Sequence, residues 1–525
     1  MAREISTRPL AAADVVTWDD EADVVVVGYG IAGVSAALGA AEAGVDVLAL
    51  ERGGGTEGLC GAVLYLGGGT PMQTAMGWED SAANMQTFLT AALGPGGVDE
   101  EKLTAYCQGS VDHYHWLVGA GVPLDPGPDP ECSALAAPAE DGFADVGGLE
   151  YAGGGLVWSG GEAAYPFDRL VPAVPRGHVP RDLGTPEERS VEEMLEGTVT
   201  KALLAHAAGT AVRVRYDTGA ERLILDPDGS VVGIEGVCAG SAVRIKARGG
   251  VVLATGSFLR NEDMLRAYCP QLPEMEIAAI GHGGQDGLGI RMGQAVGAEA
   301  IHMDAIDVTL LATPPLSFRA GILLNRHGQR FINEDTYFGR SGIEALLRHE
   351  GIAYLLLDDS IFPERSWRRP SWVSDSLLEL EHDIGFPPGA LVDTVAYYNN
   401  HAADGEDPMF HKNRPWLQRL GGTYAVIDLR AQPGPSPEGV GYIRRESSGP
   451  ADVTLGWPLT MGGLHTALEG EVAHVSGGPV DGLYAAGRTT SGLGVYGYCS
   501  GISLGDCSFF GRRAGRAAAA RARHR

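Results

Sequence analysis

A glycine-rich motif between an apolar run and an alanine-rich stretch constrains the fold more than any other feature. Ala22 to Val27 is a short, valine-rich run, typical of a strand buried on both faces of a parallel sheet. A G-x-G-x-x-G motif follows at once, residues 31–44 predict a helix, and residues 45–50 predict a second buried strand. The motif glycines are Gly28, Gly30 and Gly33. Together these segments predict one βαβ unit.

The glycine motif predicts a dinucleotide site. In such motifs the first glycine permits the tight turn, the second lets a pyrophosphate approach the main chain, and the third lets helix and strand pack closely. Ile31 and Ala32 begin the helix, whose N-terminus offers N–H groups and partial positive charge to phosphates. Glu51 ends the second strand, where a carboxylate accepts hydrogen bonds from ribose and disfavours a 2′-phosphate. Arg52 follows it, and we include it in the predicted site.

Two later strand ends favour FAD over NAD as the dinucleotide. Ala254, Thr255 and Gly256 close a further buried strand, and GLYAAGR, which contains Gly487 and Arg488, closes another near the end of the chain. A nicotinamide dehydrogenase has no evident need for a return strand so late, whereas a large flavin lying across the fold would use one. The alternative is that the two strand ends are unrelated. We predict FAD bound by both ends of the chain.

Composition excludes several other functions. The chain has 525 residues, 44% of them hydrophobic and 20% charged, as in ordinary globular proteins. Its net charge of −28 disfavours binding to nucleic acid or an anionic membrane surface. We find no transmembrane segment, secretory signal, P-loop or H-E-x-x-H motif, and the seven cysteines form no C-x-x-C pair. We therefore expect a cytoplasmic protein without a membrane span, a structural disulfide or a metal site.

The texture of the sequence changes at about residue 300 and again at about 440. Between these points aromatic residues are more frequent, and dinucleotide-fold patterns return afterwards. We predict an FAD-binding domain in two parts, residues 1–300 and 441–525, with a second, catalytic domain inserted at 301–440. Residues 121–190 are rich in proline and glycine and predict mostly loop. The predicted class is α/β, with an α+β second domain.

Several segments resemble the fumarate reductase/3-ketosteroid dehydrogenase superfamily of FAD flavoproteins. They are GYGIAG with Glu51, LGGGTP at 66–71, ATGSF at 254–258, NRHGQRFINEDTY at 325–337 and GLYAAGRTTSG at 482–492. A second group looks most like the bacterial 3-ketosteroid Δ4-(5α)-dehydrogenases, and the likeness runs from about residue 20 to 517. These segments are SGGE at 159–162, PRGHVP at 175–180, EDTYFGR at 334–340, IDLR at 427–430 and GYCSGISLGDCSFFGRRAG at 497–515.

This resemblance implies a fold, a cofactor and a set of contacts. The fold would be the discontinuous, glutathione-reductase-like FAD-binding dinucleotide fold, with the inserted domain capping the catalytic site. The last helix would begin near Ser503 to Gly505, so that its N-terminal dipole stabilises negative charge on the reduced flavin. The further cofactor contacts that it implies are Gly68, Gly69, Thr70, Ser503 and Leu504.

The resemblance also implies a reaction. In that family FAD accepts a hydride at N5 from C5 of a 3-keto-5α-steroid while a base removes a proton from C4, which leaves a 4-ene-3-one. Tyr498 and the Gly501 N–H would polarise the carbonyl, where enolate charge develops. Tyr337, assisted by the hydroxyl of Ser500, would handle the C4 proton. The expected partners are an apolar, steroid-like substrate and an external electron acceptor.

Two departures from the family pattern and two alternative functions stay open. Residues 53–62 are shorter than the family segment, and Val495 and Tyr496 replace small residues, which would put a bulky phenol beside the pocket. One alternative is a flavoprotein that reduces or desaturates a small unsaturated acid or a non-steroid enone. An acid would need an arginine clamp, and the segment after Glu334 offers only Arg340. The other alternative is a flavin electron-transfer subunit without a substrate of its own.

Overall fold

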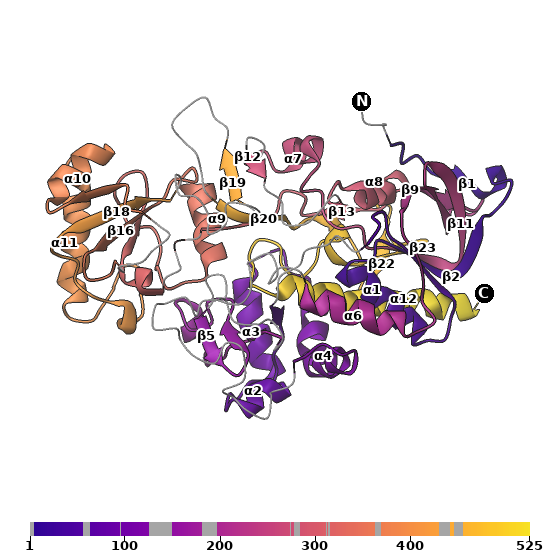
Figure 1. Ribbon diagram of the computed structural model, residues 1–525, viewed down its shortest axis with the longest axis horizontal. Coiled ribbons are helices and arrows are strands. Elements are labelled where there is room, and N and C mark those ends of the chain that lie inside the picture. The colour runs from indigo at the N-terminus through magenta and orange to yellow at the C-terminus, as the bar shows by residue number, and fades with distance from the viewer. Residues whose placement is uncertain are drawn as a thin grey trace.

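A computed structural model describes most of the chain, and its elements are labelled in Figure 1. The described residues are 5–55, 63–94, 96–124, 150–180, 197–272, 275–277, 284–310, 312, 316–362, 369–429, 442–445 and 455–524. Most of the atypical 53–62 segment and Arg430 of IDLR therefore lie outside the described residues. Within the described ranges, no helix combines the length and apolar character that a membrane span requires.

A nine-stranded sheet carries the predicted βαβ unit. Its order is β1-β9-β10-β11-β2-β3-β8, and β23 and β22 join it through β11. Five adjacent strands form a parallel part of this sheet, in the order β8, β3, β2, β11 and β23. The late strand β23 therefore lies beside β11, in the same sheet as the first strand of the unit. The bounds are β1 Leu10–Ala11, β2 Asp20–Val27, β3 Val47–Leu50, β8 Arg213–Arg215, β9 Thr218–Leu225, β10 Val231–Cys238, β11 Ser241–Leu253, β22 Glu471–Ala473 and β23 Pro479–Ala485.

Helices cover this sheet. Figure 1 shows α1, α6 and α12 next to one another, and α1 packs against both of the others. The helix α12 therefore brings the last residues of the chain back to the first βαβ unit. The bounds are α1 Ile31–Ala41, α6 Thr198–Ala208, α7 Glu262–Tyr268, α8 Leu288–Ala295 and α12 Ile502–His524.

A small antiparallel sheet lies partly within residues 121–190, whose other described residues are mostly loop, as predicted. Its order is β4-β7-β6-β5, and three of its strands fall within the described part of that range. These strands have two to four residues and little periodicity of their own, so their tertiary partners, and not local sequence, define them. The bounds here are β4 Leu64–Tyr65, β5 Glu150–Gly153, β6 Leu156–Trp158, β7 Gly177–His178, α2 Pro71–Ala75, α3 Ala82–Ala92 and α4 Glu100–Gly119.

A second, smaller layer of sheet and helix is drawn in orange in Figure 1. It contains the antiparallel sheet β15-β16-β18-β17 and the helices α9, α10 and α11. All of these elements come from residues inside the predicted insertion, and we call them the capping region; the domain boundaries stay a prediction. The bounds are β15 Ile322–Leu324, β16 Tyr354–Asp358, β17 Trp372–Ser374, β18 Tyr424–Asp428, α9 Phe338–Arg348, α10 Leu377–Ile384 and α11 Ala390–Ala402.

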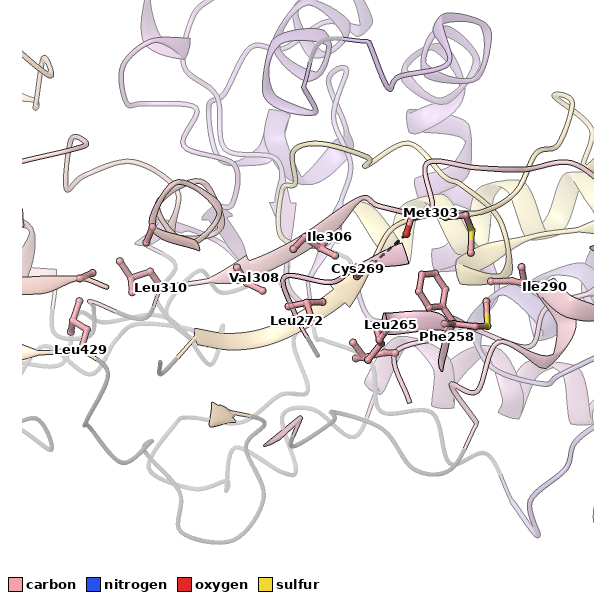
Figure 2. Packing of buried hydrophobic residues seen from close by; sticks show 14 of the residues in the cluster. Phe258, Leu265, Cys269, Leu272, Ile290, Met303, Ile306, Val308, Leu310 and Leu429 are labelled. Carbon is pink, nitrogen blue, oxygen red and sulfur yellow. Dashed lines mark hydrogen bonds between the residues drawn. The ribbon is translucent and has the colours of Figure 1, made fainter. Parts of the chain in front are cut away.

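Between the two layers, β14 (Ile306–Thr309) pairs with β20 (Leu455–Thr460) in the sheet β12-β19-β20-β14. Figure 2 shows that one buried apolar core continues along this strand. It passes from Phe258 and Ile290 through Val308 to Leu429 of the capping region. The remaining bounds are β12 Met275–Ile277, β13 Ala300–Ile301, β19 Tyr442–Arg445 and β21 Gly463–Leu464.

Candidate active site and cofactor site

The first glycine turn has the shape that a pyrophosphate site requires. Gly28 has a φ of +93°, and a Cβ there would lie 2.4 Å from the Ala254 oxygen. Only glycine therefore fits where β2 and β11 end together. A Cβ at Gly30 would meet no atom within 4 Å, and Gly30 begins α1 without a side-chain cap. This leaves open space in front of the helix N-terminus, which fits the diphosphate of FAD.

Glu51 lies where the sequence predicts it, and its carboxylate also braces the turn. Its Oε2 accepts a hydrogen bond from the Tyr29 N–H at 3.0 Å, and its Oε1 accepts one from the Gly53 N–H at 3.0 Å. Each oxygen keeps further acceptor capacity for a ribose hydroxyl. Arg52 points elsewhere, because its Nη1 lies 2.7 Å from a carboxylate oxygen of Asp286 and its side chain is 42% exposed.

The second glycine turn is held from within. The Gly68 N–H donates to Asp80 and the Gly69 N–H donates to Gln73, at 2.9 and 3.1 Å. The Thr70 hydroxyl accepts from the Gln73 N–H and lies 2.8 Å from Nε2 of His178. Thr70 is buried and caps α2, and its N–H also donates to Gln73, so both its side chain and its N–H stabilise the turn.

The other predicted cofactor residues meet at the carboxyl ends of β2, β11 and β23. The Ala254 N–H donates to the Val27 oxygen at 2.8 Å, and the Thr255 hydroxyl lies 3.2 Å from that of Thr489. The Thr489 hydroxyl also accepts from the Gly256 N–H at 3.0 Å, next to Gly487 and Arg488. This edge of a parallel sheet is where such folds bind nucleotides.

Arg488 connects this edge to the start of α12. Its guanidinium is hydrogen-bonded to the Ser503 hydroxyl, and it lies 5.8 Å from the ring centre of Tyr498. The Tyr498 hydroxyl lies 2.6 Å from that of Ser503. The helix begins at Ile502, so Ser503 and the buried Leu504 lie in its first turn, as predicted. Burial raises the pKa of Tyr498, and the positive charge of Arg488 opposes that rise.

Tyr337, which is buried, and Ser500, which is partly buried, form a pair, although 163 residues separate them. Their hydroxyls lie 3.1 Å apart. Tyr337 is the N-cap residue of α9, and the Ser500 N–H donates to the Ser159 oxygen at 2.8 Å. Burial, and then the neighbouring charges of Asp307 and Tyr498, raise the pKa of Tyr337 well above its usual value. The next residue, Gly501, has a φ of +91° and packs against the backbone of Tyr65.

Apolar side chains enclose the two phenols. Tyr498 packs against three apolar clusters, two of which form the wall described here. One contains Tyr337 with Val63, Val157, Val179 and Phe338, and the other contains Ala305, Leu459, Met461 and Val495. The prediction that Tyr496 adds a phenol to this pocket is wrong. Its side chain is 45% exposed and its hydroxyl lies 3.3 Å from Asp304, whereas the neighbouring Val495 is buried in the wall.

A pocket opens beside Tyr337 between the capping region and the small sheet. Trp158, Leu310, Phe338 and Trp416 are among its apolar lining residues, and Arg319 is a charged one. Tyr337 lines this pocket, whereas Tyr498 and Ser500 do not. No cluster of metal-ligating side chains occurs in the described ranges.

Sequence reasoning missed one buried carboxyl in this site. Asp307 of β14 lies close enough to Tyr337, Tyr498 and Arg488 for its charge to act on them. The available signal was a single aspartate inside the apolar run AIDVTLLA. A second buried group contains Asp80, Glu162 and Arg176, of which Arg176 directly precedes β7 and lies 2.7 Å from Asp80.

The fold and the cofactor site define the class of protein: a flavoprotein oxidoreductase that binds FAD at the carboxyl edge of a parallel sheet. The model of the FAD binding domain family matches residues 23–504, and the chain belongs to that family. It is an FAD-dependent enzyme acting on CH–CH groups. These matches confirm the predicted fold class, cofactor and enzyme class. The assignment of individual site residues stays a prediction.

Three relatives narrow the comparison. The crystal structure of 3-ketosteroid-Δ4-(5α)-dehydrogenase from Rhodococcus jostii RHA1, in complex with 4-androstene-3,17-dione, is 42% identical. The match covers 98% of this chain and 99% of that one, with a TM-score of 0.82. The 3-oxo-5-alpha-steroid 4-dehydrogenase of Comamonas testosteroni is 27% identical over 91% of this chain and 94% of its own length. A probable fumarate reductase, Ifc3 of Shewanella frigidimarina, is 26% identical over 94% of this chain and 74% of its own length.

Proposed function

We propose that this enzyme introduces the C4–C5 double bond into a 3-keto-5α-steroid, giving a 4-ene-3-one. The observation that carries the proposal is the part-buried pair of Tyr337 and Ser500 beside Tyr498, with both phenols in one cluster of apolar side chains. A flat, apolar ketone fits such a site, because its rings can pack against aliphatic side chains while its carbonyl oxygen accepts a hydrogen bond from a polar group at one end of the site. The relatives that act on 3-ketosteroids support the same substrate class.

In this proposal the substrate carbonyl lies at the Tyr498 end of the substrate site. A proton α to a ketone becomes acidic only if the developing oxyanion is stabilised by donors already in position. The Tyr498 hydroxyl is held by Ser503 and lies near the positive charge of Arg488, which strengthens it as a donor. We place the substrate C3 oxygen against this hydroxyl and the Gly501 N–H.

The proton leaves C4 through the Tyr337–Ser500 pair. One hydroxyl of the pair takes up the C4 proton as it passes its own proton to the other, and that second hydroxyl gives up its proton to an acceptor beyond the pair, so both end neutral; either oxygen can be the first, since either can be the donor. The residues Gly28, Gly30, Glu51, Gly256 and Arg488 would hold FAD, which when bound supplies the hydride acceptor for C5. An external electron acceptor would then reoxidise the enzyme.

The small unsaturated acids are a weaker fit. Their carboxylate would need arginines that are free to bind it. Arg340, which the sequence offered for this purpose, donates to the Tyr165 oxygen and to Thr336, at 3.0 and 3.1 Å, and so serves the contact between α9 and the segment before it. We also propose a cytoplasmic enzyme, since the five cysteines of the described ranges are free thiols.

The test is anaerobic mixing of the FAD-loaded enzyme with steroids of defined stereochemistry. A 3-keto-5α-steroid should bleach the flavin absorbance, whereas its 5β isomer, with the C5 hydrogen on the opposite face, should bleach it far more slowly. A 4-ene-3-one should leave the spectrum oxidised. If no 3-keto-5α-steroid bleaches the flavin but 4-oxocyclohexane acids or fumarate exchange electrons with it, the proposed substrate is wrong.

A further inference from the structure

One buried carboxyl of the site has no part in the mechanism above. Asp307 lies in the middle of β14, and its neighbours Ile306 and Val308 belong to the apolar core. Side chains alternate along a strand, so Asp307 points to the other face, which is the face of the two phenols. Asp307 is only 3% exposed to solvent. An aspartate at such a position opposes folding unless something else requires it.

Asp307 is surrounded by the ring of Tyr337, an apolar residue of β20 and a few titratable or charged groups. A Cβ built on Gly339 would lie 3.2 Å from Asp307 Oδ1 and 2.5 Å from Tyr337 Cε1, so the carboxyl and the edge of the phenol ring border the same small space. Its cross-strand neighbour on β20 is the apolar Leu459. The titratable or charged groups that face it are Tyr337, Arg488, Tyr498 and Cys499.

The carboxyl of Asp307 lies near charged groups, but no described residue donates a hydrogen bond to it. Arg488 is too far away for an ion pair. Burial therefore raises the pKa of Asp307 to about 7, although the charge of Arg488 opposes the rise. A carboxyl that exchanges protons near neutral pH is what a proton acceptor in an enzyme needs.

The Tyr337–Ser500 pair needs such an acceptor. Burial keeps the pKa of Tyr337 well above its ordinary value, so a phenolate there is unstable and the pair can only pass a proton onward. We propose that Asp307 receives the proton that this pair removes from the substrate C4. This inference rests on the proposed function. Asp307 does not touch C4: it acts through Tyr337, whose ring edge borders the same small space as the carboxyl.

The transfer balances. The C4–H bond breaks and its electron pair becomes the second bond between C4 and C5, while the hydride leaves C5 for the bound cofactor. The C4 proton moves through the Tyr337–Ser500 pair to Asp307, whose carboxylate becomes a neutral carboxylic acid. Both hydroxyls end as they began. Asp307 returns its proton to solvent before the next turnover.

The test is the pH dependence of flavin reduction in single turnovers. Asp307 must be ionised to accept the proton, so the wild-type rate should rise about tenfold per pH unit below pH about 7 and level off above it. In Asp307→Asn, which keeps the shape and loses the charge, the plateau rate should fall about 100-fold and the rise near pH 7 should vanish. An Asn variant with an unchanged pH profile overturns the inference.

Asp506 provides the matched control. It is the other carboxyl near Arg488 whose pKa burial raises, in this case to about 6. Asp506→Asn should keep the rise near pH 7, because Asp506 faces Arg488 and Lys102 from α12 and has no contact with Tyr337. If Asp506→Asn abolishes that rise and Asp307→Asn does not, Asp506 is the acceptor and the inference fails.

Two further measurements separate the possible failures. On enzyme whose flavin is reduced beforehand, loss of deuterium from C4 of a 3-keto-5α-steroid reports proton transfer alone, and Asp307→Asn should slow it about 100-fold. If Asp307→Asn does not fold, Asp307→Glu carries the test, and an unshifted pH midpoint in it counts against Asp307. A wild-type enzyme that no 3-keto-5α-steroid reduces would instead refute the proposed function.

Discussion

The two phenols of the site differ in their partners, and the difference separates their roles. Tyr337 is hydrogen-bonded to Ser500 and lies beside the carboxyl of Asp307, so negative charge on its oxygen is opposed. Tyr498 is hydrogen-bonded to Ser503 and lies near the positive charge of Arg488, so negative charge close to its oxygen is stabilised. An oxyanion therefore fits the Tyr498 side, and a neutral proton carrier fits the Tyr337 side.

This difference predicts the effect of removing the Tyr498 hydroxyl. Tyr498→Phe should keep the ring packed against its apolar neighbours and lose the donor to the carbonyl. Loss of one oxyanion donor lowers a rate by about 100- to 1000-fold, and we expect that loss in the rate of anaerobic flavin reduction. The control is Tyr496→Phe two residues away, where the phenol is exposed. Equal rates in the two variants would contradict the assignment.

Among single residues, the sequence predicted the site residues that lie in recognisable motifs, and it missed the one whose importance depends on its burial. Tyr337, Tyr498 and Ser500 stand in recognisable segments, and the structure brings all three together. Asp307 stands in an ordinary strand, and its role depends on which face of β14 it occupies and on what packs there. That information is tertiary. Arg52 shows the reverse: a charged residue next to a motif whose side chain pairs with Asp286 at the surface.

At the scale of elements, glycines set how the first and last helices meet. A Cβ on Gly515 of α12 would lie 1.9 Å from the Ala36 oxygen of α1, and one on Gly39 of α1 would lie 2.3 Å from the Arg512 oxygen of α12. The two backbones therefore touch where side chains would hold them apart. This contact joins the phosphate-binding helix to the helix that carries Ser503, so it fixes both ends of the cofactor site.

We expect Gly515→Ala to separate the two helices. Inserting a methyl group where no space exists costs about 1–3 kcal/mol of unfolding free energy. FAD should also dissociate more readily, because the N-termini of α1 and α12 shift relative to each other. Thermal melting and FAD titration check both effects. The control is Gly119→Ala in the last turn of α4, where a Cβ meets nothing within 4 Å and a small gain in stability is expected. A neutral Gly515→Ala would show that the helices adjust.

The elements themselves were predictable where the local pattern was strong. The predicted helix at 31–44 agrees with α1, and the predicted strand at 45–50 agrees with β3. The small sheet β4-β7-β6-β5 was not predictable, because strands of two to four residues are specified by the strands beside them.

At the scale of the whole molecule, a buried ionic network stiffens the part of the capping region that carries Tyr337. Arg330 binds both Glu334 and Asp407 at 2.9 Å, and Lys412 binds Glu334 at 2.9 Å. All four side chains are at most 3% exposed. Glu334 stands three residues before Tyr337, so the network fixes the segment from which that phenol enters the site.

The same segment connects the capping region to the rest of the fold. The Asn413 side chain, next to Lys412, donates to the Ala163 oxygen at 2.6 Å, and the side chains of Asn333 and Arg340 donate to the Tyr165 oxygen at 3.2 and 3.0 Å. Sequence texture predicted an inserted region, but these contacts join residues about 170 to 250 positions apart, and no local pattern marks them.

Removing Arg330 should therefore affect both stability and catalysis. Arg330→Leu leaves Glu334 and Asp407 buried with too little positive charge, which costs about 3–5 kcal/mol in comparable buried pairs. Arg326→Leu is the matched control, because it removes an exposed pair with Glu350 that contributes less than about 1 kcal/mol. Thermal melting should show a large loss for the first variant and little for the second, and flavin reduction should slow only in the first.

Acid should have the same effect as the Arg330 variant. Burial alone would raise the pKa values of Glu334 and Asp407, but the adjacent cations overcome it and lower both below their ordinary values. A carboxylate with a lowered pKa contributes stability that is complete above its unfolded-state pKa and is lost as the pH falls through its folded-state pKa. Wild-type melting temperature should therefore drop steeply below pH about 4. In Arg330→Leu the two carboxyls lose their main cation and take up protons at higher pH, so the drop should begin at a higher pH than in wild type. A drop at the same pH in both proteins would mean that other carboxylates govern acid unfolding and that the network is not what holds Tyr337 in place.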